Sequence, residues 1–205
     1  SCYLDYLVFR TNDHKKLDLA HKFFKKPIIN ALSDLSHPCQ AISDLYTLKE
    51  NFGSINNLNI VWMGDMNNVL FSLLEAISFT KNTKVDVFTD EAIYSNNKDS
   101  FNLNKNINFH FNINEEIIAK ANCIMTDVFT SMNDKEDKEN LLSKFQVNEN
   151  IMSLTDKKSV FMHCLPAKIG SEVSEGVIKG EKSIVLAQAR NRLVAQKGIL
   201  KWLSI

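Results

Sequence analysis

Several signals that mark common classes of protein are missing from this chain of 205 residues. The longest apolar runs, such as 159–162, have the length of a strand, whereas a membrane-spanning helix needs about 20 apolar residues. Lys plus Arg and Asp plus Glu each number 24, so no basic excess suggests a nucleic-acid partner. The first residues lack the basic start and apolar core of a signal peptide. The sequence predicts a soluble intracellular protein.

Cysteine and arginine are also scarce. The cysteines lie far apart with no C-x-x-C spacing, which without a secretory signal indicates reduced thiols: Cys2, Cys39, Cys123 and Cys164. Only three of the 24 basic residues are arginines: Arg10, Arg190 and Arg192. Because a guanidinium suits bidentate capture of phosphate or carboxylate, each arginine is a candidate ligand-binding residue.

The amino-acid composition is that of a globular protein, with 44% hydrophobic and 23% charged residues. Short apolar runs alternate with amphipathic stretches. We expect strands at 4–9, 27–30, 59–63, 84–88, 107–111, 122–126, 160–163 and 183–186. We expect helices at 15–24, 38–50, 69–79, 115–120, 134–145 and 191–203, and an irregular Asn-rich stretch at 95–106. Strands separated by helices imply parallel crossovers, so the predicted fold class is α/β, with a doubly wound, Rossmann-like parallel sheet.

The same pattern suggests a division into domains. A Gly- and Asn-bearing connection over 51–58 favours a boundary there, and segment 52–187 holds enough elements for a complete domain. Segment 1–51 offers two strands, which cannot shield both faces of a sheet, so we expect it to be the tail end of a larger α/β domain. Residues 188–205 are predicted to form a C-terminal helix that packs back toward that domain. The absence of an initial Met suggests processing, an artificial start or a fragment, and the incomplete first unit favours a fragment of a longer protein.

Polar candidates gather where the predicted strands end. In an open α/β sheet, ligands bind outside the carboxyl ends of the strands. The residues at these ends are Arg10, those over 37–40 and 64–68, Asp127 with Ser131 and Met132, and those over 164–166. Pro38 disfavours helical geometry at His37 and starts a helix. His37 is therefore either part of a helix N-terminus suited to phosphate or an oxyanion, or a buried residue that caps its own helix.

The other candidates have plainer alternatives. Gly64 stands alone where a dinucleotide-binding turn needs three glycines, and Asn67 suits a helix N-cap. Asp127, like Ser131, also suits a cap or a turn. Cys164 adjoins His163, but neighbouring strand residues point to opposite faces, so we expect neither a direct Cys–His pair nor a zinc site.

Five stretches, taken together and in their order along the chain, resemble one protein family. They are 30–45 around His37-Pro38-Cys39-Gln40, 64–69, 127–132, 161–167 with its His-Cys-Leu-Pro element, and 191–197. Together they are similar to the aspartate/ornithine carbamoyltransferases, and within them to the ornithine enzymes. The resemblance implies transfer of a carbamoyl group from carbamoyl phosphate to the δ-amino group of ornithine, without metal or organic cofactor. It also implies a homotrimer in the cytoplasm, or in the mitochondrial matrix of a eukaryote.

The resemblance also assigns roles. The residues matched to carbamoyl phosphate binding are Arg10, His37, Gln40, Cys164, Leu165 and Arg192. Those matched to ornithine binding are Asn68, Asp127, Ser131, Met132 and Cys164. Catalysis is assigned to Arg10, His37, Gln40 and Cys164, with the thiol of Cys164 orienting the reacting amine and not forming a covalent bond. Catalysis would then consist of positioning and charge stabilisation.

The chain departs from the family at several points. The family's Ser-x-Arg-Thr element has no counterpart, because Arg10-Thr11 matches a later arginine. Asn133 replaces a glycine after the Ser-Met pair, Ile169 replaces a basic residue, and Arg190 replaces an acid. Three alternatives remain open: a truncated remnant that binds an amino acid without catalysis, a putrescine carbamoyltransferase and, more distantly, a dehydrogenase.

Overall fold

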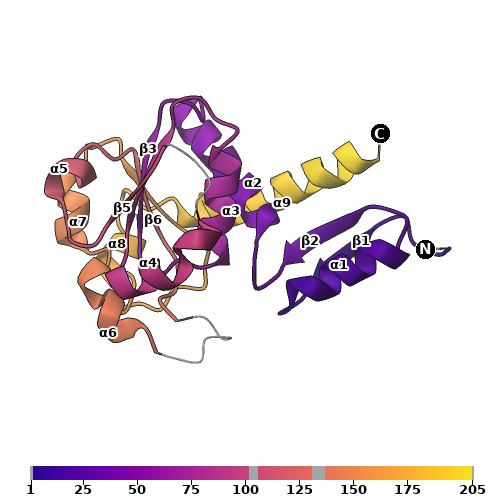
Figure 1. Cartoon of the computed structure of the whole chain (residues 1–205). Coiled ribbons are helices and arrows are strands. Elements are labelled where there is room, and N and C mark those ends of the chain that lie inside the picture. Colours follow the sequence, from indigo (N-terminus) through magenta and orange to yellow (C-terminus); the bar gives the residue numbers. More distant parts are fainter. Residues whose placement is uncertain (1, 102–105, 131–136, 205) are drawn as a thin grey trace.

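The computed structural model describes residues 2–101, 106–130 and 137–204. Its larger sheet has five parallel strands in the order β5-β4-β3-β6-β7 (Figure 1). They are β3 (Asn59–Met63), β4 (Lys84–Phe88), β5 (Ile107–His110), β6 (Cys123–Thr126) and β7 (Val160–His163). The chain moves outward from β3 to β5 and then adds β6 and β7 on the other side of β3. This reversal is the doubly wound arrangement, so the predicted fold class is confirmed.

Helices cover both faces of this sheet. In Figure 1, α2 (Pro38–Phe52) and α3 (Asn68–Ile77) lie on one side of the strands, and α5 (Glu115–Ile118) and α7 (Glu149–Leu154) lie on the other. Because both faces are covered, the central strands are apolar almost throughout, and Ile60, Trp62 and Phe88 are fully buried. The shorter helical segments are α4 (Glu91–Asn97), α6 (Glu139–Leu142), α8 (Glu175–Ile178), η1 (Lys98–Ser100) and η2 (Ser143–Phe145).

Three helices occupy segments for which the sequence suggested none: α4, α7 and α8. α4 (Glu91–Asn97) begins four residues before the stretch expected to be irregular and ends inside it. The side chain of Asp90 accepts a hydrogen bond from the Ala92 N–H and caps its first turn. α7 begins in the same way after Asn148, whose side chain accepts from the Ile151 N–H. Single polar caps thus started helices that are too short for a clear apolar period.

The strand predicted at 183–186 is wrong. Ser183 forms only an isolated bridge with Phe161 of β7, and the chain turns into α9 (Val185–Leu203) two residues later. The final helix therefore begins six residues before its predicted start at 191. The first turns of α9 contain Leu, Ala and Gln, which favour a helix over a strand.

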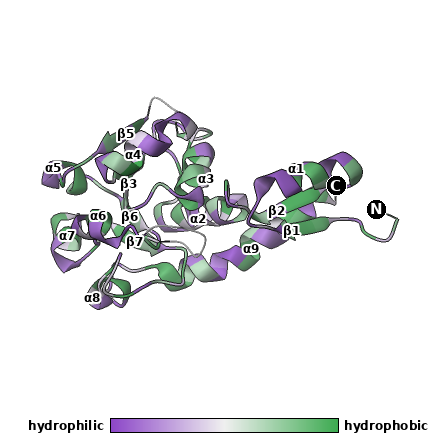
Figure 2. Cartoon of the chain, turned by 60° about the horizontal axis from the view of Figure 1, so that its bottom comes forward, coloured by the Kyte–Doolittle hydropathy of each residue, from purple (hydrophilic) through white to green (hydrophobic). Residues whose placement is uncertain are grey.

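A smaller unit precedes the large sheet. It consists of β1 (Leu7–Arg10), α1 (His14–Phe23) and β2 (Ile28–Leu32), and its two strands pair in parallel. No residue of β1 or β2 is buried, and Val8 is 61% exposed. Figure 2 shows this unit apart from the large sheet, with hydrophobic residues along its strands. Two strands and a helix bury too little apolar surface to form a core of their own.

Helices α2 and α9 pack against each other between the two units. α2 begins at Pro38, as predicted, and ends at Phe52, followed by Gly53, whose positive φ of 74° forms a left-handed C-cap. α9 runs from the large sheet toward the small one, where the Tyr6 and Ser204 hydroxyls lie 2.8 Å apart (Figure 1). None of the helices described is both long and apolar enough to cross a lipid bilayer.

Candidate active site

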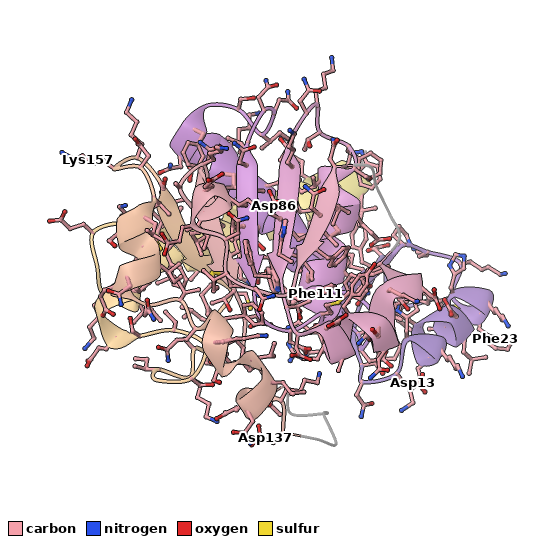
Figure 3. The ribbon with its side chains drawn as sticks, turned by 60° about the vertical axis from the view of Figure 1, so that its left-hand side comes forward. Asp13, Phe23, Asp86, Phe111, Asp137 and Lys157 are labelled. Atoms are coloured by element: carbon pink, nitrogen blue, oxygen red, sulfur yellow. The ribbon has the colours of Figure 1, made fainter. Side chains whose placement is uncertain are left out.

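The candidate residues of the large sheet lie at the carboxyl ends of its strands. Figure 3 shows the polarity: Lys157, which precedes β7, lies toward one end of the strands, whereas Phe111 and Asp137, which follow β5 and β6, lie toward the other. This is the end at which parallel α/β sheets bind their ligands.

His37 is buried at the N-terminus of α2. It occupies the N-cap position of α2, but its side chain makes no capping bond, and its backbone N–H donates to the Ser72 hydroxyl at 2.6 Å. The Nδ1 atom is buried without a hydrogen-bond partner within the described chain. Burial lowers the pKa of His37 to about 4, helped by the positive charges of Arg192 and Arg10. The imidazole is therefore neutral at physiological pH, and both arginines act on it.

Gln40 connects α2 to α9. It is buried, its Nε2 donates to Asp44 Oδ1 at 2.9 Å, and its Oε1 accepts a hydrogen bond from Arg192. Gln188 of α9 also donates to Asp44 Oδ1, at 2.7 Å. Burial raises the pKa of Asp44 to about 7, although these two amides and the charge of Arg192 lower it. His37, Gln40 and Arg192 thus come together from two helices.

A second group surrounds Asp127, which is buried after β6. Asn67 donates to Asp127 Oδ2 at 2.8 Å, and the Cys164 thiol donates to Oδ1 at 3.0 Å. Asn67 also accepts from the N–H groups of Val69 and Leu70, so it is the predicted N-cap of α3. Burial raises the pKa of Cys164 well above its ordinary value, and the Asp127 charge adds to the effect. Cys164 is therefore a protonated thiol and not a thiolate nucleophile.

The turn after β7 is held by His163. Leu165, whose φ is +55°, donates its N–H to His163 Nδ1 at 2.9 Å, and His163 Nε2 lies 3.1 Å from Glu172 Oε1. Nδ1 accepts, so Nε2 carries the proton and donates to the carboxylate. The side chains of His163 and Glu172 have no exposed surface. This pair fixes the backbone next to Cys164.

The expectation that His163 and Cys164 point apart is wrong. β7 ends at His163 and the chain bends, so potential ligand atoms of His163, Cys164 and Asp127 all lie within 4.8 Å of one another. Such a trio can bind a metal ion. Here both histidine nitrogens and the thiol already have partners, so a cation would have to displace those hydrogen bonds.

The remaining predicted residues are less tightly placed. Arg10 is exposed at the end of β1, and the Asn68 amide donates to the Ser33 carbonyl at 2.6 Å. A pocket of about 340 Å³ lies beside this amide, lined among others by Asn67, Asn68, Phe71 and Lys138. Ser131, Met132 and Asn133 lie outside the described residues, and Ile169 and Arg190 are exposed.

Family models cover both units of the chain. Residues 56–203 match the Asp/Orn binding domain of aspartate/ornithine carbamoyltransferase, and residues 1–50 match its carbamoyl-P binding domain. The chain belongs to the aspartate/ornithine carbamoyltransferase family.

Similar proteins carry the name ornithine carbamoyltransferase. Those from Brucella abortus (strain 2308) and Rhodopseudomonas palustris (strain BisA53) are 38% and 40% identical over 98% of the chain. The solved enzymes from Thermus thermophilus and Pyrococcus furiosus are each 35% identical, with TM-scores of 0.85 and 0.84 and 98% and 97% of the chain covered. The chain spans 66% of the length of the two curated relatives, and 67% and 66% of the two solved chains.

In this member of the carbamoyltransferase family, several buried polar residues behind the site escaped prediction. They are Asp44, Ser72, Glu172 and Gln188. Asp44 follows Gln40 by four residues on one helix, so that spacing was a usable local signal. Glu172 accepts from the nearby Lys168 N–H and lies nine residues from His163, whereas Gln188 reaches Asp44 only through the tertiary fold.

Proposed function

We propose that this protein transfers the carbamoyl group of carbamoyl phosphate to the δ-amino group of ornithine, giving citrulline and phosphate. The observation that carries the proposal is the meeting of two groups at one end of the sheet: the cationic and neutral donors around His37 and the Asp127–Cys164 pair. The names of the relatives, ornithine carbamoyltransferases, support the same assignment.

The first group suits carbamoyl phosphate. In this proposal, Arg10 and Arg192 supply positive charge for the phosphate, and Leu165 and Cys164 border the carbamoyl group. Neutral His37, whose pKa is lowered to about 4, offers a hydrogen bond to the carbonyl oxygen without adding a charge. Donors aimed at that oxygen stabilise the oxyanion of a tetrahedral intermediate.

The second group suits ornithine. Asp127 offers a buried carboxylate to a substrate ammonium, and Asn68 borders a pocket whose volume of about 340 Å³ is at the lower end of small-molecule sites. Ser131 and Met132 are assigned to the same ligand, although they lie outside the described residues. The protonated thiol of Cys164 orients the reacting amine.

The proposed reaction needs no covalent enzyme intermediate. The neutral amine attacks the carbonyl carbon and forms a carbon–nitrogen bond. The carbon–oxygen bond to phosphate then breaks, phosphate leaves with the electron pair, and the nitrogen releases a proton to the leaving group. Orientation and oxyanion stabilisation supply the rate enhancement.

The decisive experiment compares two acceptors. Protein expressed from its complete reading frame is incubated with carbamoyl phosphate and either ornithine or putrescine, and citrulline and carbamoylputrescine are quantified. We expect citrulline. A clear preference for putrescine would contradict the acceptor assignment, and no product with either amine would favour a remnant that binds an amino acid without catalysis.

The assembly and domain division are also proposals. We propose a homotrimer, a carbamoyl phosphate-binding unit over 1–51, an ornithine-binding domain over 52–187 and a returning helix over 188–205. Light scattering of the native protein measures the oligomeric state, and an intact mass well above 23.4 kDa would identify the chain as part of a longer polypeptide. A monomer in light scattering would contradict the trimer.

A further inference from the structure

A polar centre lies behind the candidate site, between α2 and α9. Asp44 has no exposed surface, yet it carries a carboxyl group. Gln40 Nε2 and Gln188 Nε2 both donate to its Oδ1, at 2.9 and 2.7 Å. Its Oδ2 is buried with no hydrogen-bond partner among the described residues. One oxygen therefore holds two amides, one from each helix.

The first of these bonds sets the orientation of Gln40. A glutamine amide has a donating and an accepting end, and rotation by 180° exchanges them. Because Nε2 is bound by Asp44, Oε1 faces Arg192, which donates to it. A reversed amide would turn N–H groups toward the guanidinium and place two oxygens against each other at Asp44. Asp44 thus selects the end of Gln40 that faces the ligand side.

The second bond reaches the opposite wall of the site. Gln188 uses its Nε2 for Asp44, so its Oε1 is available to accept the backbone N–H of His163 at 2.9 Å. His163 is followed directly by Cys164, whose thiol donates to Asp127. A continuous chain of hydrogen bonds therefore runs from Gln40 through Asp44 and Gln188 to the turn after β7.

We propose that Asp44 is a positioning residue for carbamoyl transfer, which fixes the amide of Gln40 and, through Gln188, the backbone beside Cys164. This inference rests on the proposed function. Asp44 does not contact the substrate. It fixes the position of the Gln40 side chain relative to the backbone beside Cys164.

The geometry also says which property of Asp44 matters. Both bonds end on Oδ1, so an acceptor oxygen is required there and a negative charge is not. Burial raises the pKa of Asp44 to about 7, and a proton on the unpartnered Oδ2 leaves both bonds intact. Asn has nearly the same shape and keeps an acceptor oxygen, whereas Leu removes it.

The kinetic test uses Asp44→Asn, Asp44→Leu and Thr47→Val in protein from the complete reading frame. Thr47 lies on the same helix interface and accepts from Asn191 at 3.1 Å, and its hydroxyl donates to the Ser43 carbonyl. Among the described bonds, none joins Thr47 directly to Asp44, Gln40 or the Gln188 side chain. Loss of one hydrogen bond corresponds to about a tenfold effect. We expect Asp44→Leu to raise KM for carbamoyl phosphate about tenfold or more, and Asp44→Asn and Thr47→Val to stay within about threefold of wild type. Equal losses in the Asn and Leu variants would overturn the acceptor argument.

A second measurement does not depend on activity. The side-chain amide protons of Gln40 should exchange slowly with solvent in the wild type and in Asp44→Asn, and fast in Asp44→Leu, as followed by nuclear magnetic resonance. Fast exchange in the wild type would overturn the positioning role. If the wild type forms no citrulline but this exchange pattern holds, the proposed function fails while the contact from Asp44 to Gln40 stands.

Discussion

Replacing Asp44 with Asn is expected to change the pH dependence of stability in a defined direction. Burial raises the pKa of Asp44 from 3.8 to about 7, against the lowering by Gln188, Gln40 and Arg192. Between these two values the folded protein holds a proton that the unfolded chain has released. The raised pKa therefore stabilises the fold at low pH, and this contribution is lost as the pH rises through the folded-state value.

The size of the effect follows from the shift. Integrated from about pH 5 to about pH 8, the difference in proton binding amounts to about two pH units, or about 3 kcal/mol at about 1.4 kcal/mol per unit. The Asn variant has no such proton to lose. We therefore expect the free energy of unfolding of Asp44→Asn, minus that of wild type, to be about 2–3 kcal/mol larger at about pH 8 than at about pH 5.

Urea unfolding of both proteins at the two pH values measures this difference. His37, whose pKa is lowered from 6.5 to about 4, contributes the opposite slope, but it does so in both proteins and cancels. Thr47→Val removes a buried hydroxyl without removing a titratable group, so its effect should be the same at both pH values. The reasoning is refuted if Asp44→Asn behaves like this control.

Three further outcomes are expected. Arg192→Gln removes a charge-assisted donor and should raise KM for carbamoyl phosphate about 10–100-fold. The control Arg190→Gln, on the exposed surface of the same helix, should leave KM unchanged. Equal effects of the two substitutions would contradict the assignment of Arg192. Iodoacetamide at mildly alkaline pH should alkylate exposed Cys2 before Cys164, whose pKa burial raises, as mass spectrometry of peptides can show; prior reaction of Cys164 would indicate a thiolate. Gly198→Ala, where an added Cβ meets nothing within 4 Å, should raise the free energy of unfolding by about 0.5–1 kcal/mol; destabilisation in urea would contradict this.

Local rules were sufficient for much of the architecture. The five strands of the large sheet were predicted within one or two residues, because apolar runs of strand length separated by amphipathic stretches leave few other solutions. The start of α2 followed from Pro38, and the N-cap of α3 followed from Asn67. At both helix starts the decisive interaction is local, within four positions along the chain.

Where local signals competed, prediction failed. The apolar residues over 183–186 suit a strand as well as the start of a helix, and the strong helix formers that follow decided for α9. α4 and α7 are six or seven residues long, so an apolar period had too little length to be read, and their caps alone did not distinguish them from turns.

The site residues, like the helices and strands, were predictable where local signals sufficed and not where distant segments had to pack. Sequence order showed that His37, Gln40, Asp127 and Cys164 each follow a strand or lie at a helix start, and parallel topology brings such positions to one side of the sheet. Arg192 lies in the interior of α9, and only the packing of α9 on α2 brings it to Gln40. It could not show that Asp44 accepts from Gln188, because 144 residues separate them and only the packing of α2 on α9 brings them together. Nor could strand alternation show that the chain bends after His163 and turns Cys164 toward Asp127. Short-range hydrogen bonds and side-chain periodicity can be read from neighbouring residues in the sequence. The pairing of buried polar groups arises only after the apolar faces of distant segments have packed.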